Sequence, residues 1–132
     1  MELMASDDSS LSREARPAVR LSRPVIETDL NRHLAEIRAG DAYRDGDHAA
    51  ETLVKEPGLR LVLIALKDGG RLREHRAHTS ITVQVVEGMV RFTVDSRTIE
   101  LVRGWVLAVD ADLPHDLEAV GESAVLLTMG GL

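Results

Sequence analysis

The chain has 132 residues, 44% of them hydrophobic, with one Trp, one Tyr and one Phe, which suits a single domain with an aliphatic core. Its formal net charge of −6 argues against nucleic acid or an anionic membrane as a partner, and the absence of cysteine excludes disulfides, thiolate metal sites and thiol nucleophiles. No stretch approaches the roughly 18 apolar residues of a membrane span, and the N-terminus lacks the apolar run of a signal peptide, so we expect a cytoplasmic protein.

Residues 1–24 are predicted to be a flexible tail. They mix Ser, Asp, Arg and two prolines without helical or strand periodicity, and such a segment buries too little apolar surface to order itself. A basic nucleic-acid arm is the alternative, but acidic residues lie among the arginines and favour a solvated tail. The arginines are Arg13, Arg16, Arg20 and Arg23.

Residues 25–48 are predicted to form a short helix and a loop that pack on the rest of the chain. Apolar residues recur at the helical spacing i, i+4 and i+7, namely Leu30, Leu34 and Ile37. Thr28 or Asp29 can cap the start of this helix, and Gly40 can end it. An amphipathic helix over 27–40 is therefore expected.

Two histidines of this segment lack the surroundings of a ligand. His33 lies off the apolar stripe of the helix, so we expect it to be exposed rather than to bind a metal. Residues 41–48 are polar and predict a loop, in which His48 has no partner nearby in the sequence.

From residue 49 onward, short apolar runs alternate with turn residues. Glu56-Pro57-Gly58 places proline and glycine where a tight turn prefers them, and residues 89–94 alternate between apolar and polar as a half-buried strand does. The pattern predicts an all-β domain over 49–132 with about eight or nine short strands. The expected strands are 52–55, 59–66, 71–75, 81–87, 89–94, 98–102, 105–109, 115–120 and 124–129.

The strand over 59–66 is apolar on both faces. Such a strand is covered on both sides, here by the predicted helix or by a second subunit. A homodimer is therefore one expectation.

Glycine and histidine recur in two segments at a recognisable spacing. The first is Gly-Arg-Leu-Arg-Glu-His-Arg-Ala-His over 70–78, running on to Gly88, and the second is Gly-Trp-Val-Leu-Ala-Val-Asp over 104–110, running on to Pro114-His115. Together they resemble the two motifs of the RmlC-like cupin superfamily, of the type 2 conserved-barrel kind, over about 59–129. The resemblance implies a double-stranded β-helix, a jelly-roll barrel that binds a small molecule, here with a short N-terminal helical extension.

The resemblance also implies candidate metal ligands. His75 matches the first histidine of one motif and His115 the histidine of the other, whereas Ala77 and Ile81 stand where the family has a second histidine and a glutamate. His78, one residue further on, and Gln84, further along the same strand, are the two candidate substitutes. The implied site is then His75, His115 and His78 around one divalent ion such as Zn, Fe, Ni, Cu or Mn. The alternative is a metal-free pocket lined by His75 and His115, with His78 on a solvated loop.

Strand geometry limits which side chains meet in this pocket. Ile81 and Val83 are predicted to line the barrel interior, and Gln84, of opposite parity, joins them only if a bulge shifts the register. His75 and His78 likewise converge only if the chain bends between residues 77 and 80.

Three functions are compatible with these residues. The first is a metal-assisted cupin acting on a small organic substrate, and the second is a metal-free binding or sensing module for a small apolar or amphipathic ligand. The third is a structural or interaction subunit whose barrel is filled by its own side chains. Arg71, Arg73 and Arg76 near the mouth would suit an anionic ligand, but surface exposure is the favoured explanation for these arginines.

Overall fold

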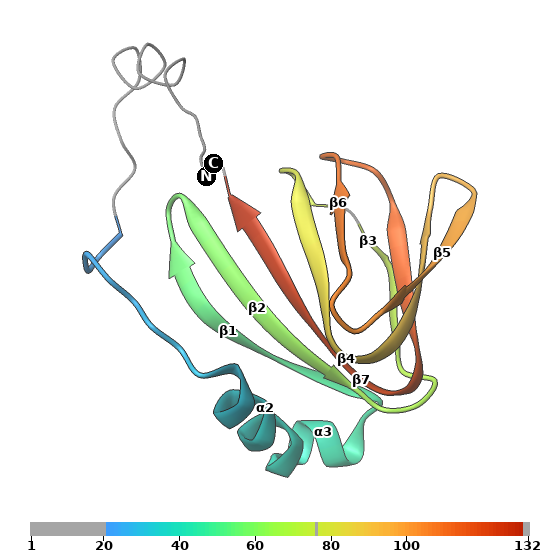
Figure 1. Cartoon of the computed structure of the whole chain (residues 1–132), viewed down its shortest axis with the longest axis horizontal. Coiled ribbons are helices and arrows are strands. Elements are labelled where there is room, and N and C mark those ends of the chain that lie inside the picture. Colours follow the sequence, from blue (N-terminus) through green and yellow to red (C-terminus); the bar gives the residue numbers. More distant parts are fainter. Residues whose placement is uncertain (1–20, 76, 131–132) are drawn as a thin grey trace.

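The architecture of the described residues is one seven-stranded antiparallel sheet that bends into two layers, called the two sheets below, which share two long strands (Figure 1). The computed structural model describes residues 21–75 and 77–130, so most of the predicted tail and Arg76 lie outside the described residues. The elements in chain order are α2 (Leu30–Ala39), α3 (Asp41–Asp45), β1 (His48–Glu56), β2 (Leu59–Leu66), β3 (Arg71–His75), β4 (Ile81–Val94), β5 (Arg97–Val102), β6 (Val106–Val109) and β7 (His115–Gly130).

Strands β4 and β7 run side by side along their whole length and belong to both sheets. The first half of β4 and the second half of β7 form one sheet with β1, β2 and β6. Their other halves form the second sheet with β3 and β5. The sheets diverge from the bends in β4 and β7, as Figure 1 shows. This topology confirms the predicted all-β fold with a short helical part.

Each long strand was expected as two, and this prediction was wrong. The ladder between β4 and β7 shifts register between Val85 and Met89, where Gly88 adopts a φ of +78°. Gly121 bends β7 at a φ of +81°. Because glycine tolerates positive φ and a bulge bends a strand without ending its pairing, the chain continues through both positions. The described part therefore has seven strands rather than eight or nine.

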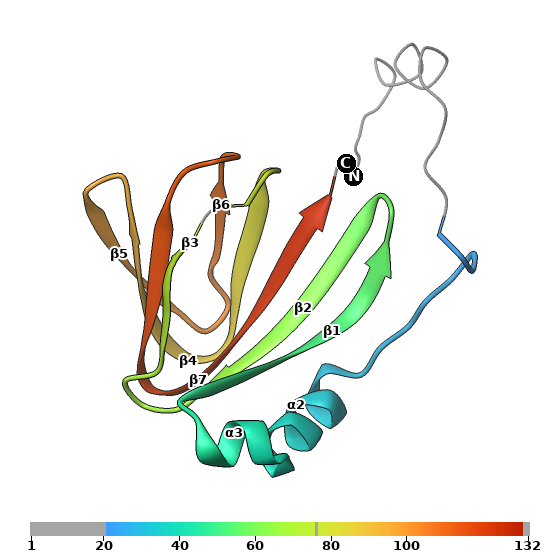
Figure 2. The same ribbon diagram turned by 180° about the vertical axis from the view of Figure 1, so that it is seen from behind.

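The main core lies between the two sheets. Near the bends it is filled by side chains that are at most 1% exposed, among them Val83, Val85, Val90, Phe92, Leu101 and Val125. A second core lies between β2, β7 and the helices, where Leu63 and Ala65 meet Leu34 and Ile37. The prediction that both faces of β2 are covered is confirmed, and the helices provide the cover on the outer face (Figure 2).

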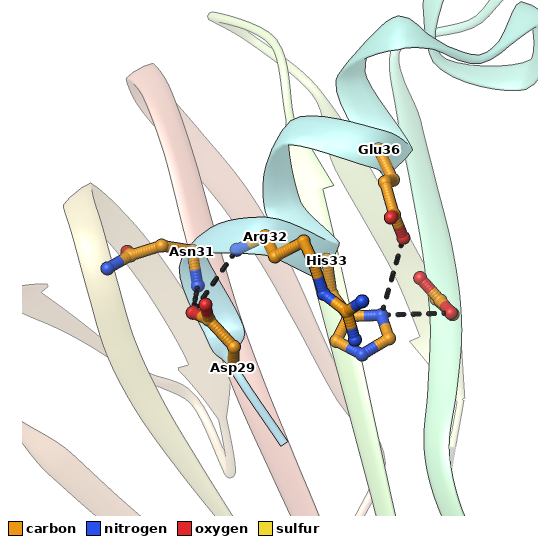
Figure 3. Close-up of polar contacts among 6 residues, drawn as sticks. Asp29, Asn31, Arg32, His33 and Glu36 are labelled. Carbon is orange, nitrogen blue, oxygen red and sulfur yellow. Dashed lines mark hydrogen bonds and ion pairs between the residues drawn. The ribbon is translucent and has the colours of Figure 1, made fainter.

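The helical segment begins and ends where its cap residues predict. Asp29 accepts hydrogen bonds from the backbone N–H groups of Asn31 and Arg32, as Figure 3 shows, and Gly40 donates to the carbonyl of Ile37. The loop expected over 41–48 instead begins with the short helix α3. The reason is tertiary, because Tyr43 is only 6% exposed and packs in the second core.

Two polar contacts connect these helices to the bends. Arg38 Nη2 lies 3.0 Å from a Glu87 carboxylate oxygen, and the Tyr43 hydroxyl donates to Glu122 over 3.0 Å. Burial, followed by the hydrogen bond to the Glu122 carboxylate, raises the pKa of Tyr43. Among the described residues, no helix has the length and apolar character to cross a membrane.

Candidate functional site

His115 is the predicted ligand that the fold buries. It is the first residue of β7, where its Cα partners are Val94 on β4 and His75 on β3. The residue is 5% exposed, and its ring stacks on Phe92 with centroids 5.1 Å apart and planes 21° from parallel. The aromatic contact and the flanking strands hold the imidazole in one orientation.

The hydrogen bond of His115 also sets which ring nitrogen carries a proton. Its Nδ1 lies 3.0 Å from the backbone carbonyl oxygen of Leu113. A carbonyl only accepts, so Nδ1 donates, and in the neutral ring the acceptor nitrogen is Nε2. Metal-binding histidines commonly have this Nδ1–H to carbonyl arrangement, and so do histidines that accept a proton from a ligand.

The other positions of the predicted metal site, at residues 77, 78 and 81, do not supply the remaining ligands. The His78 side chain is 93% exposed, and its Nδ1 lies 3.7 Å from an Asp112 carboxylate oxygen. The chain does bend after β3, but the bend leaves His78 in solvent. Ala77 and Ile81 contribute apolar groups to the main core. The described residues therefore do not fit the four-ligand metal centre that the cupin motifs imply.

The three residues expected to line a pocket lie on two faces of β4. Ile81 and Val83 are 4% and 0% exposed in the main core. Gln84 is exposed on the other face and is the register partner of Val106. The register of β4 is regular as far as Val85, so no bulge turns Gln84 inward. None of the three lines any of the hollows found among the described residues.

The largest of three hollows described among residues 21–75 and 77–130 opens between β2 and β3 and has a volume of about 450 Å³. We call it the β2–β3 hollow. Its apolar wall consists of Ile64 on β2, Leu72 on β3 and Leu127 on β7, all of which contact the main core. Four polar residues complete the lining, namely Asp47, His48, Arg71 and Arg73. A volume of this size is typical of sites for small organic molecules.

The polar rim is connected by short contacts. Asp47 pairs with Nδ1 of His48 over 2.7 Å and accepts the backbone N–H of Arg71 over 3.2 Å. The contact with His48, together with that backbone donor, holds the pKa of Asp47 below its usual range. Arg71 Nη2 lies 3.0 Å from Asp116. No sequence pattern indicates this grouping, because Asp47 and Arg71 are 24 residues apart.

Two smaller hollows are described among the same residues. One, of about 220 Å³, is lined by Arg60, Ala77, His78, Thr79 and Met129. The Arg60–Met129 pair lies two residues along the β2–β7 ladder from the Val62–Leu127 pair and therefore on the same face, so this hollow continues the inner face of the β2–β3 hollow. The other, of about 280 Å³, lies at the β4–β5 turn, and His115 contributes to its lining.

Comparison with known proteins gives a family and a fold. The family model for the cupin domain matches residues 62–130. No curated protein matches the chain.

Solved structures of similar fold come from several bacteria. A cupin superfamily protein of Desulfitobacterium hafniense is 20% identical, with a TM-score of 0.62 over 85% of this chain and 94% of that one. An RmlC-like cupin of Desulfovibrio desulfuricans is 27% identical, with a TM-score of 0.59 over 63% and 81%. Salicylate 1,2-dioxygenase of Pseudoaminobacter salicylatoxidans is 21% identical, with a TM-score of 0.66 over 76% of this chain but 31% of that one. The likeness to the first and last of these shows the fold alone.

Proposed function

We propose that this chain, which belongs to the cupin domain family, binds a small amphipathic carboxylate in the β2–β3 hollow. The observation that carries the proposal is the composition of that hollow. Its wall is aliphatic, from Ile64, Leu72 and Leu127, and two arginines line it from β3. An apolar body with one anionic end complements this arrangement, because burial of the body and a guanidinium contact to the carboxylate act together.

The charges of the rim favour an anion over a cation. Nη2 of Arg71 forms an ion pair with Asp116 at 3.0 Å, and the side chains are 42% exposed for Arg71 and 26% exposed for Asp116. Arg73 comes from the same strand, two residues further on. The negative charge of Asp47 lies against His48 and the backbone of Arg71. The two guanidinium groups are therefore the groups of the rim that suit a carboxylate.

Isothermal titration calorimetry tests the proposal with hexanoate and benzoate, each compared with its primary amide. We expect the carboxylates to bind and the amides to bind more weakly, because an amide keeps the apolar body but lacks the charge. Loss of a charge-assisted hydrogen bond costs about 1.5 to 3 kcal/mol, which corresponds to roughly 10- to 100-fold in affinity. Arg73→Gln should weaken the carboxylates by this factor and change amide binding little.

Arg91→Gln is the matched control, because Arg91 is exposed on β4 and pairs with Glu100 outside the hollow. This variant should bind both carboxylates as the parent does. Equal affinity for acids and amides would refute the arginine contribution. If neither acids nor amides bind, and amide-proton spectra show no shifts at Leu72 or Leu127, the hollow is not the ligand site for this class.

A metal held by His75 and His115, with His78 as the predicted third ligand, is a second candidate function. The observations that favour it are the β3–β7 register, which pairs these two positions, and the carbonyl contact at Nδ1 of His115. A bound divalent ion would supply Lewis-acid polarisation of a substrate oxygen. The apolar groups at Ala77 and Ile81 and the exposure of His78 argue for the metal-free function first.

Metal analysis by inductively coupled plasma mass spectrometry separates the two candidates. Untagged protein purified without chelators is compared with His75→Ala, His115→Ala and, as a matched control, His48→Ala. Near-stoichiometric metal that is lost in the first two variants and kept in the third would support the metal site. Metal kept in all three would exclude this ligand pair. The predicted homodimer and cytoplasmic location stay predictions, and sedimentation analysis tests the first.

A further inference from the structure

Three side chains of the types that bind metal ions, those of His33, Glu36 and Glu51, converge on the outer surface of the barrel between α2 and the edge strand β1. Nδ1 of His33 lies 3.1 Å from a Glu51 carboxylate oxygen and 3.7 Å from a Glu36 carboxylate oxygen. One ligand atom from each residue lies within 4.8 Å of the other two. Figure 3 shows His33 and Glu36 on successive turns of α2, with the imidazole directed at the neighbouring strand. We call these three residues the α2–β1 cluster.

The spacing within the cluster matches that of ligands around one small ion. In a tetrahedral site with bonds of about 2.1 Å to nitrogen and oxygen, neighbouring ligand atoms lie about 3.4 Å apart. The two nitrogen–oxygen distances of 3.1 and 3.7 Å lie on either side of this value. His33 and Glu36 are three residues apart on the helix and therefore share one face, while Glu51 comes from β1.

Burial restrains the imidazole more than its sequence position suggests. The sequence places His33 off the apolar stripe and predicts exposure, but its side chain is 18% exposed. The carboxylates are 59% exposed for Glu36 and 39% for Glu51, so the cluster is open to solvent on one side. A rigid nitrogen ligand beside two accessible carboxylates leaves room for a water molecule as the fourth ligand.

Charge balance favours a divalent ion over a proton in this cluster. Two carboxylates that share a site repel each other, and a protonated imidazole offsets only one of the two charges. A divalent ion with a neutral imidazole offsets both. One nitrogen and two carboxylate oxygens are suitable ligands for zinc and for other borderline first-row ions.

We infer that the α2–β1 cluster, formed by His33, Glu36 and Glu51, is a surface site for one divalent transition-metal ion, independent of the barrel interior and of the proposed ligand. Because two ligands lie on the helix and one on the edge strand, the bound ion joins α2 to β1. Apart from this cluster, α2 docks on the sheet through the second core, where Leu34 and Ile37 meet Leu63 and Ala65 of β2. The ion would thus stabilise the docking of the helical segment on the sheet.

Calorimetric titration of the full chain with zinc chloride tests the inference, after removal of metal with a chelator and near neutral pH. We expect one ion per chain. Glu36→Gln and Glu51→Gln, which keep side-chain size and remove one anionic ligand each, should weaken zinc binding by about tenfold or more. Glu100→Gln is the matched control, since this exposed glutamate pairs with Arg91 on the other sheet. It should bind zinc as the parent does.

Two further measurements distinguish ligation from other effects. Cobalt(II) should give a visible absorption spectrum of a nitrogen–oxygen site, and the spectrum should be lost in His33→Asn. Zinc should raise the melting temperature of the parent protein but not of Glu51→Gln. Zinc binding that survives both carboxamide variants and disappears in His115→Ala would place the ion in the barrel and overturn the inference. Absence of binding below millimolar zinc would overturn it as well.

Discussion

Replacement of Gly88 by alanine should destabilise the protein through the bend of β4. Gly88 has a φ of +78°, and a Cβ added there would lie 2.5 Å from the carbonyl oxygen of Glu122 and 3.0 Å from the Cα of Ser123. Both are backbone atoms of β7, so they cannot move aside without disturbing the β4–β7 ladder. Gly121 is a matched control with a φ of +81°, because a Cβ added there meets nothing within 4 Å.

The two variants separate backbone strain from steric overlap. A non-glycine residue at left-handed φ costs about 1 to 2 kcal/mol, and this is the whole expected effect of Gly121→Ala. Overlap in a packed region adds about 1 to 3 kcal/mol. Gly88→Ala should therefore cost about 2 to 5 kcal/mol, a large part of the 5 to 15 kcal/mol that is typical of a domain. The melting temperature should fall by roughly 10 °C or more.

Urea unfolding followed by circular dichroism measures both free energies of unfolding under the same conditions. The expected order is parent, then Gly121→Ala, then Gly88→Ala, with at least about 1 kcal/mol between the two variants. Equal losses in the two variants would mean that the close approach of β4 and β7 imposes no requirement for glycine. The steric part of the reasoning would then be refuted.

Three further outcomes follow from single contacts. Ser123→Ala should lower the free energy of unfolding by about 1 to 3 kcal/mol in the same assay, because the buried hydroxyl accepts a backbone N–H of β4 that then loses its partner. The single tyrosine, Tyr43, should titrate above its usual pKa of 10.0 in an ultraviolet absorbance titration, since it is buried and bonded to Glu122. Because the pKa of Tyr43 is raised in the folded state, the stability that this residue contributes is complete at pH values below its unfolded-state pKa. That stability is lost as the pH rises through the folded-state pKa. Glu122→Gln should lower the titration midpoint of Tyr43. The contact with His48 lowers the pKa of Asp47 in the folded state. The contribution of Asp47 to folding stability is therefore present at pH values above its usual pKa of 3.8 and is lost as the pH falls through its folded-state pKa. The stability difference between the parent and Asp47→Asn should therefore shrink in acid, and a difference that is constant with pH would contradict this reasoning.

The sequence predicted those parts of the fold that depend on neighbouring residues. The spacing of Leu30, Leu34 and Ile37 predicted the helix face that the structure buries against β2. Its boundaries followed from Asp29 and Gly40, whose capping geometry involves residues within four positions. Turn chemistry located most strand ends. These features need no knowledge of the rest of the chain, because helical periodicity, caps and tight turns are local.

Other features depended on residues far apart in the chain. Gly88 was read as a break between strands, although pairing with β7 carries β4 through it. His33 was expected in solvent, but Glu51, 18 residues away, lies 3.1 Å from its ring. The rim of the β2–β3 hollow joins Asp47 to Arg71. No local pattern reports such contacts.

The candidate site shows the same division. The glycine and histidine spacing identified the family and indicated His115, which the fold buries beside Phe92. It left open whether His78 lies in solvent, whereas strand parity indicated that Gln84 faces away from the barrel interior in the absence of a bulge. The sequence by itself determined the family, the helix and the alternation of apolar and polar residues in most strands, because each of these features depends on residues that are close together along the chain. Only the tertiary structure decided where the hollow opens and which charged groups meet, because side-chain proximity follows from strand pairing and packing between distant segments.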